Sequence, residues 1–340
     1  MEDRAANLAT TEFAFIRALS EFGLQGKLSA LPAERDKLFV LDDSSGRKFI
    51  VRLSVDEEEP QAIVSQNEVL DAISRVDASL PVPRVMASRS GDKIVWVSDG
   101  AARCALRVFS FLPGVPVGKT VRSLAQLRAV AFALARLDRT LSAVEGQRGG
   151  NADVWNVVNA RSLIPLLVSE PDDSTRDMAK RALERFGTEL APKLETLPHQ
   201  LIHNDFNTKN VLVDQHEPAK VTGIIDFGDL MYAPRVLDLA VLLSKFATAS
   251  SPLSDAQEAV AAYVRALPLS KAEIASIYPL LATRTAMRIA VWGDRAGGRG
   301  HPGARQFAQD AASLLRSLER VGEAAFTSAL LERALRPADA

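Results

Sequence analysis

The chain has 340 residues and a formal net charge of -1, so no basic surface field points to a nucleic-acid partner. Its 47% apolar and 24% charged residues are ordinary for a folded domain, and the length suffices for one large or two medium domains. A single cysteine excludes an internal disulfide framework and a cysteine-rich zinc site. We expect Cys104, in its apolar context, to fill the core rather than to act as a nucleophile.

The sequence gives no sign of a membrane or secretory segment. Residues 1–11 are charged and have no apolar core, so we expect no signal peptide. The long apolar segment 124–141 is interrupted by charged residues, as in an amphipathic helix, and no run approaches the roughly 18 apolar residues of a membrane span. We therefore expect a cytoplasmic protein with no membrane partner. The sequence leaves monomer and homodimer open.

The N-terminal part of the chain combines one helical pattern with strand patterns. Apolar residues recur at helical spacing over 11–22, which predicts a helix. Residues 38–42 and 48–53 are β-prone, and Ser44-Ser45-Gly46 predicts a hairpin turn between them. Acidic residues followed by Pro60 favour a helix start, and this helix should end near residue 77. Further strands are predicted at 85–87, 93–97 and 107–111.

Beyond Pro116 the pattern is mostly helical, with one β-prone island at 201–227. The expected helices cover 123–144, 152–168, 174–190, 235–248, 255–266, 271–292 and 304–336. We place the boundary near 112–118, which gives a small lobe at 1–112 and a helical lobe at 113–340. This α+β organisation, an antiparallel sheet with one main helix followed by a large helical lobe, predicts a cleft in which a ligand binds.

The most informative segment is 201–229. It contains His203-Asn204-Asp205, and Asn210 follows five positions after Asp205. An apolar strand, a short polar turn and a second apolar strand come next, and Asp226-Phe227-Gly228 follows directly. The pattern is therefore His-x-Asp-x-x-x-x-Asn, a hairpin and Asp-Phe-Gly.

This spacing suits phosphoryl transfer, which needs positioning and charge neutralisation more than covalent chemistry. One carboxylate must accept the proton of the attacking hydroxyl, and Asp205 is the candidate catalytic base. Hard Mg²⁺ prefers oxygen ligands, which the amide of Asn210 and the carboxylate of Asp226 would supply. We expect His203 to brace the loop by hydrogen bonds to the backbone.

Each part of the pattern is weak alone, since Asp-Phe-Gly and His-x-Asp both occur by chance. The plainer interpretation is a surface hairpin with solvated polar residues. Four polar residues at the required spacing, flanked by two apolar strands in the required order, favour the chemical interpretation.

The segment resembles the aminoglycoside phosphotransferase/choline kinase superfamily, which shares the protein-kinase fold. Within it, the stretches around Asp205 and Asp226 are most similar to the hydroxylysine kinase branch. Three other segments resemble that branch: the hinge-like 106–114, the helix start Asp153-Val154-Trp155-Asn156, and the turn at 80–83. Asn156 stands where an Asp is expected. The resemblance implies that 1–112 binds nucleotide and that 113–340 holds the catalytic loop and the substrate pocket.

The resemblance also implies roles for two charged residues of the small lobe. The strand 49–52 matches the one that carries the phosphate-binding lysine, and this chain has Arg52 there. Arg can bind phosphate oxygens bidentately, although it is not equivalent to Lys. Glu68 matches the helix glutamate that orients this cation. The plainer interpretations are a solvated strand arginine and an exposed helical glutamate. The phosphate-covering loop should be 33–38, which lacks glycine.

For the adenine ring, the resemblance implies apolar contacts from Ile50 on one side and from Leu212 and Ile225 on the other. The edge of the ring should hydrogen-bond to backbone groups of Val108 and Ser110. Apolar residues at such positions are as often simply part of the core.

The acceptor pocket is less well marked. Asp229 is a candidate for a substrate amine or the metal site, and a turn cap is its alternative. Trp155 is a candidate pocket wall or a core residue. Arg284 and Arg288 share a helix face and would suit a carboxylate, with a solvated basic face as the alternative; Arg295 and Arg299 follow in a Gly-rich stretch. We expect Asp238, within an apolar helix, to anchor the catalytic loop.

The preferred hypothesis is a kinase that uses ATP, or another nucleoside triphosphate such as GTP, with Mg²⁺ to phosphorylate a hydroxyl of an amino-acid-like acceptor such as 5-hydroxylysine. The same chemistry could serve an aminoglycoside, homoserine, choline or a sugar. A third hypothesis is a catalytically inactive kinase fold that acts as a binding module. Asp205, Asn210 and Asp226 are all present, which disfavours the inactive module.

Overall fold

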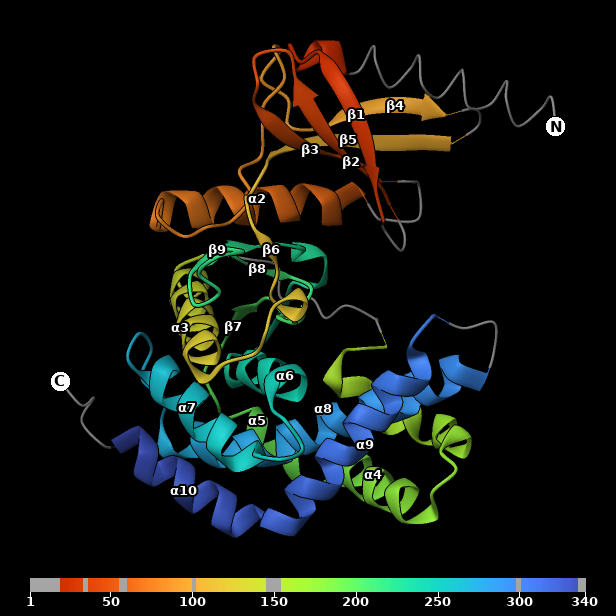
Figure 1. Cartoon of the computed structure of the whole chain (residues 1–340), viewed down its shortest axis with the longest axis vertical. Coiled ribbons are helices and arrows are strands. Elements are labelled where there is room, and N and C mark those ends of the chain that lie inside the picture. Colours follow the sequence, from red (N-terminus) through yellow and green to blue (C-terminus); the bar gives the residue numbers. More distant parts are fainter. Residues whose placement is uncertain are drawn as a thin grey trace. The chain divides into compact units, whose positions relative to one another are not determined.

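The computed structural model describes residues 19–32, 36–54, 60–99, 102–144, 154–297 and 301–335 (Figure 1). The chain divides into two compact units. Unit 1 comprises Met1–Pro113 together with Gly223–Ile225, and unit 2 comprises Gly114–Thr222 together with Asp226–Ala340.

Unit 1 contains a five-stranded sheet in the order β1-β2-β3-β5-β4, in which every neighbouring pair is antiparallel. The helix α2 runs along this sheet (Figure 1). The predicted β2–β3 hairpin is formed, and Gly46 has φ of 82° in its turn. The elements are β1 (Gly26–Leu31), β2 (Lys37–Asp43), β3 (Lys48–Ser54), α2 (Pro60–Val76), β4 (Val95–Asp99) and β5 (Ala102–Ser110).

The core of unit 1 follows from the alternation of side chains along the strands. Val51 and Leu53 point to the core from β3, and Leu106 and Val108 do so from β5. Cys104 is fully buried among them, as expected of a core residue. The apolar face of α2 is buried in the same unit.

The structure differs from the sequence expectation at two places in unit 1. The strand β1 has mostly exposed side chains, so it lacks the apolar alternation that would reveal it. The expected strand at 85–87 is wrong, because only Val85 makes a bridge, to Phe109. In the expected helix at 11–22 the structure describes only the last turn, because 11–18 lie outside the described residues. The acidic residues 56–59 that were expected to open the next helix also lie outside them.

Unit 2 is built around α8, which packs with α9, α6, α4 and η2, while α3 packs with α7 (Figure 1). Every residue of α8 from Leu280 to Trp292 is buried, and this run includes the charged side chains of Arg284 and Arg288. The helices are η1 (Val117–Lys119), α3 (Leu124–Leu141), η2 (Val157–Ser169), α4 (Asp173–Arg185), η3 (Phe186–Leu190), α5 (Ala191–Leu194), η4 (Phe227–Asp229), α6 (Val236–Phe246), α7 (Pro252–Val264), α8 (Lys271–Gly297), α9 (Ala304–Val321) and α10 (Glu323–Leu335).

Two of the expected helices differ in form. The segment expected as a helix at 152–168 is a 3₁₀-helix, η2, and Pro165 inside it lacks the main-chain donor that an α-helix needs. The segment 304–336 is divided into α9 and α10 at Gly322, which has φ of 78°. No described helix is both long and apolar enough to cross a membrane.

Short strands of unit 2 hold the central motif. In order they are β6 (Val115–Pro116), β7 (His199–Ile202), β8 (Val211–Val213), β9 (Val221–Ile224) and β10 (Met231–Pro234). β7 pairs with β10, and β8 lies between β6 and β9. The sequence predicted the β-prone island at 201–227 but not β10. The His-Asn-Asp segment therefore begins where β7 ends.

Candidate active site

Asp238 of α6 fixes the start of the loop between β7 and β8 by hydrogen bonds to its backbone. Its two carboxylate oxygens accept hydrogen bonds from the main-chain N–H groups of His203, at 2.7 Å, and Asn204, at 2.6 Å. Asp238 is fully buried, and Asn204 has φ of 62°, in the left-handed region. A buried carboxylate that accepts two N–H groups fixes this backbone conformation. Asp238 thus makes the anchoring contacts expected from the sequence.

Within the loop, both carboxylate oxygens of Asp205 are oriented by amides. Asn207 Nδ2 donates to Oδ1 at 2.7 Å, and Asn210 Nδ2 donates to Oδ2 at 2.7 Å and to the carbonyl of Asp205 at 3.0 Å. The main-chain N–H of Asp205 donates to His203 Nδ1 at 3.3 Å, and the His203 ring packs against Phe206 and Phe227. His203 therefore contacts the loop as a brace would.

The surroundings of Asp205 favour its protonated form relative to water. Burial is the largest cause and raises the pKa of Asp205, and the nearby carboxylate of Asp226 raises it further. The Asn207 hydrogen bond and the charge of Arg284 oppose this and lower the pKa. A carboxylate with a raised pKa is the better proton acceptor, which suits a general base.

Asp226 is exposed and has φ of 65°, so a non-glycine residue holds left-handed backbone at the start of η4. Among the described residues its carboxylate has no hydrogen-bond or ion-pair partner. A Cβ atom on Gly228 would lie 3.3 Å from Asp226 Oδ1 and would crowd it. Such strained backbone persists where the surrounding fold determines it, and it is frequent at functional sites.

The oxygen groups near Asp205 fit a hard divalent cation. Asn210 turns its nitrogen to Asp205, which leaves its amide oxygen without a hydrogen bond in the described part of the chain. The Asp226 carboxylate is likewise unpaired. No group of three or more His, Cys, Asp and Glu side chains in the described ranges could hold a metal by itself. One or two oxygen-bearing side chains, completed by phosphate and water ligands, are what Mg²⁺ uses in phosphoryl-transfer sites.

Behind Asp238 lies a second buried carboxyl group that sequence reasoning missed. Burial is the largest cause of the raised pKa of Asp138 on α3, and the charge of Asp238 adds to it. Tyr263 of α7 donates to Asp138 Oδ2 at 2.6 Å, whereas Oδ1 meets no donor in the described structure, as expected if it carries the proton. The protonated Asp138 can then donate to Asp238. The only sequence signal is an acidic residue within an apolar helical stretch.

Two of the predicted substrate-side residues, Trp155 and Arg284, contact each other. Arg284 is buried and donates to the carbonyls of Trp155 and, at 3.5 Å, Asn204, so it connects the catalytic loop to the segment that precedes η2. Its guanidinium carbon is 5.8 Å from the centre of the Trp155 ring. The ammonium of Lys245 on α6 is 5.7 Å from the same ring. Sequence reasoning missed Lys245, although it lies seven residues after Asp238 and hence on the same helix face.

The other arginines that were candidates for a substrate carboxylate have different environments. Arg288 is buried and donates to the carbonyl of Ser244, which argues against the alternative of a solvated basic face at this position. Arg295 lies over the ring of Trp292 at 4.9 Å. Arg299 lies outside the described residues. Asp229 ends the short helix η4, is partly buried, and stays a prediction as a substrate ligand.

In unit 1 the expected pairing of Arg52 with Glu68 is wrong. Arg52 on β3 forms an ion pair with Asp36, and Glu68 is exposed on α2. The polar residue of α2 that reaches the sheet is Gln66, whose side-chain oxygen accepts from the buried Arg107 of β5 at 2.9 Å. The motif identified the right helix, but the helix presents Gln66 rather than Glu68 to the strands.

The expected adenine contacts need one correction. The N–H of Ser110 donates to the carbonyl of Arg84, and the carbonyl of Val108 accepts from Met86, so the segment after Pro83 occupies these backbone groups. Among the described residues, no hydrogen bond is formed by the main chain of 111–113, which follows β5. Three residues expected to contact the ring, Ile50 on β3, Leu212 on β8 and Ile225 after β9, stay predictions.

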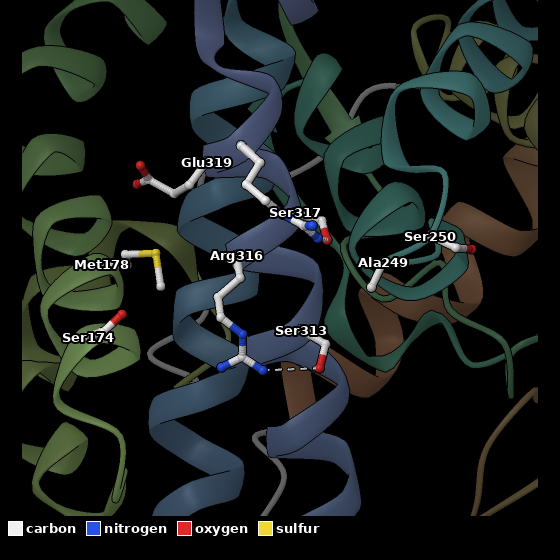
Figure 2. A pocket seen from close by; sticks show the side chains of 9 residues that line it. Ser174, Met178, Ala249, Ser250, Ser313, Arg316, Ser317 and Glu319 are labelled. Atoms are coloured by element: carbon white, nitrogen blue, oxygen red, sulfur yellow. Dashed lines mark hydrogen bonds between the residues drawn. The ribbon is translucent and has the colours of Figure 1, made fainter.

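A separate groove of about 840 Å³ in unit 2 contains none of these residues (Figure 2). Figure 2 shows Arg316 of α9 pointing along it, with a hydrogen bond to Ser313. Arg316 also donates to Thr175 and lies 3.7 Å from Asp172, so nearby groups of the same unit already occupy its donors. The chemistry-bearing residues are at the β7–β8 loop and not in this groove.

Comparisons with known proteins agree with this geometry. The sequence profile of the phosphotransferase enzyme family matches residues 27–274. Hydroxylysine kinase of Mus musculus is 24% identical over 290 residues, covering 78% of this chain and 77% of the mouse protein. That of Danio rerio is 25% identical over 268 residues, covering 75% of each.

Among solved structures, amicoumacin kinase in complex with AMP-PNP, Ca²⁺ and amicoumacin gives a TM-score of 0.66 at 15% identity, covering 94% of this chain and 95% of that one. A microcompartment-associated aminopropanol kinase gives a TM-score of 0.65 at 22% identity, covering 94% of this chain and 98% of that one. At such identities the likeness establishes the fold, which is protein-kinase-like. Because the family profile spans most of the sequence, the chain belongs to the phosphotransferase enzyme family and is a small-molecule phosphotransferase.

Proposed function

We propose that this chain is an ATP- and Mg²⁺-dependent kinase that phosphorylates a hydroxyl of a small amino-acid-like acceptor, such as 5-hydroxylysine. The observation that carries the proposal is the arrangement around Asp205. Two amides orient its carboxylate, burial raises its pKa, and the unpaired oxygens of Asn210 and Asp226 belong to the same short segment.

In the proposed reaction the oxygen of the acceptor hydroxyl bonds to the γ-phosphorus of ATP, and Asp205 accepts the proton of that hydroxyl. The bond from that phosphorus to the β–γ bridging oxygen breaks, and ADP leaves. Asn210 and Asp226 would hold Mg²⁺, which neutralises charge on the phosphates. Asp238 and His203 keep the loop in place throughout, because their contacts are to its backbone.

ATP is the proposed nucleotide, and GTP is its alternative. The amicoumacin kinase was solved with AMP-PNP, and aminoglycoside 2'-phosphotransferase-IIIa with GDP, so ATP and GTP must be compared directly. We propose Arg52 as a phosphate-binding cation, for which phosphate oxygens would compete with Asp36. The unpaired backbone of 111–113 is the corrected candidate for binding the base.

The acceptor class is supported by the relatives and by the charges around Trp155. Two curated relatives are hydroxylysine kinases, and one structural neighbour is an aminopropanol kinase, so amino acids and amino alcohols are the first acceptors to test. The two cations near the Trp155 ring suit an acceptor that carries an anionic group. They disfavour an aminoglycoside, whose several amines would need carboxylates around them.

The test is a coupled ADP-release assay with purified protein, ATP or GTP, and Mg²⁺, run across hydroxylysine, homoserine, choline, aminoglycosides and sugars. We expect acceptor-dependent ADP release with an amino acid or amino alcohol, and loss of that signal when EDTA removes Mg²⁺. An aminoglycoside as the best acceptor would contradict the proposed substrate class. Absence of release with every acceptor would instead support the binding-module hypothesis.

A further inference from the structure

Lys245 occupies an unusual position for a lysine. It lies in the last turn of α6, a helix whose other residues are almost all buried, and its own side chain is partly buried. Among the described residues its ammonium has no hydrogen-bond acceptor and no ion-pair partner. The ammonium instead lies over the Trp155 ring, 5.7 Å from its centre. A cation in such a place costs stability, so packing alone does not explain it.

The charged groups around Lys245 define an anion site. Asp205 lies close enough to favour the ammonium electrostatically. Arg288 and Arg284 on α8 and Lys209 in the catalytic loop all repel the ammonium. The cations of Lys245 and Arg284 both lie within 6 Å of the centre of the Trp155 ring, and cations gathered in one place attract an anion. Asp205 itself would face the acceptor hydroxyl in the proposed reaction.

Resting on the proposed kinase function, we infer that Lys245, beside the Trp155 ring, binds the carboxylate of an amino-acid acceptor whose hydroxyl lies at Asp205. Arg284 cannot do this alone, because it already donates to the carbonyls of Trp155 and Asn204. Lys245 has all three of its donors available, and an ammonium-carboxylate pair is among the stronger hydrogen bonds in proteins.

A γ-phosphate contact is the main alternative for Lys245. The unpaired oxygens of Asn210 and Asp226 mark where the metal and the phosphates would lie. Lys245 is instead placed with Trp155 and Arg284, residues that contribute no metal ligand. The two assignments differ in their kinetics, since a carboxylate anchor changes the KM of the acceptor and a phosphate contact changes the KM of ATP.

The experiment compares each amino-acid acceptor with its decarboxylated partner: hydroxylysine with 1,5-diaminopentan-2-ol, homoserine with 3-aminopropan-1-ol, and threonine with 1-aminopropan-2-ol. The quantity measured is the ratio of kcat/KM for the acid to that for the amino alcohol. We expect Lys245→Met to lower this ratio roughly 10- to 100-fold, through the KM of the acid, as for loss of a charged hydrogen bond. Lys245→Arg should restore part of it. Lys271→Met, at the exposed start of α8, is the matched control and should leave the ratio unchanged.

Several results would overturn the assignment while leaving the kinase proposal intact. They are a wild-type preference for the amino alcohols, an equal loss for acid and alcohol in Lys245→Met, or a change confined to the KM of ATP. If the wild type releases no ADP with any pair, the kinase proposal fails. Calorimetric titration of the same pairs into the protein with Mg²⁺ and AMP-PNP then decides the carboxylate site by itself: acid-selective binding lost in Lys245→Met supports it, and its absence refutes it.

Discussion

Replacing Lys245 by Met should stabilise the protein, and by an amount that depends on pH. Burial is the main cause that lowers the pKa of Lys245 from 10.5 to about 7, with Arg288 as the next cause. The unfolded chain keeps this proton up to about pH 10, whereas the folded protein releases it near pH 7. The unfolded state therefore binds more protons between these values, and the unfolding free energy of the wild type rises with pH in that window.

The magnitude follows from the size of that window. One pKa unit corresponds to about 1.4 kcal/mol, so the wild type should gain about 2–3 kcal/mol between pH 6.5 and pH 9 from this group alone. Lys245→Met lacks this ammonium and therefore lacks the rise in unfolding free energy. Its stability advantage should therefore be largest at or below pH 7 and should shrink by about 2–3 kcal/mol by pH 9.

Urea unfolding of both proteins at pH 6.5 and pH 9 measures the difference directly. Packing changes caused by Met are independent of pH, and titrations shared by the two proteins cancel in the comparison. Lys271→Met controls for the loss of a lysine as such. A stability difference that stays constant, or that grows with pH, would refute the claim that Lys245 lies in a strained cationic environment.

Three other substitutions have expected outcomes. Two of them test the anchoring of the β7–β8 loop, and the third tests a tight backbone contact. In thermal melts, Asp138→Asn should be as stable as the wild type at pH 4 and increasingly more stable than it up to pH 7. The pKa of Asp138 is raised in the folded protein, so over this range the unfolded wild type loses a proton that the folded wild type keeps, and its stability falls. Asn has no such proton to lose, and its amide can still donate a hydrogen bond to Asp238. Asp238→Ala should lower the unfolding free energy by about 2–5 kcal/mol in urea titrations, because two buried N–H groups lose their acceptor. Gly114→Ala should cost about 1–3 kcal/mol, because Gly114 has φ of 125° and a Cβ would lie 2.7 Å from the carbonyl of Val213.

Sequence spacing predicts the local contacts of the β7–β8 loop, which carries the candidate catalytic base. The interval from Asp205 to Asn210 is bridged by direct hydrogen bonds, so local chain geometry alone determines it. The expected contacts of Asp238 and His203 are also formed, because both residues bond to backbone near them in the motif. Motifs whose partners lie a few residues apart, or in the next buried helix, are the ones that a single sequence can predict.

The errors concern contacts that depend on how separate elements pack. Arg52 pairs with Asp36 on a neighbouring strand segment rather than with Glu68, since which side of α2 meets the sheet is set by its whole apolar face. The backbone groups of Ser110 were predicted to be available, but the 84–86 segment occupies them. Sequence reasoning missed Lys245 because its position among other cations depends on packing. Those cations come from α8 and the β7–β8 loop, which are far apart in the sequence.

The roles of the two aspartates can be separated in one pair of measurements. Calorimetry with Mg²⁺ and AMP-PNP, combined with turnover of the best acceptor, should be done on Asp205→Ala and Asp226→Ala. We predict that Asp205→Ala binds the nucleotide within about threefold of the wild type while turnover falls at least about 100-fold, as for loss of a general base. Asp226→Ala should instead lose metal-dependent nucleotide binding. The reverse pattern, with nucleotide affinity lost in Asp205→Ala and retained in Asp226→Ala, would contradict the assignment of base and metal ligand.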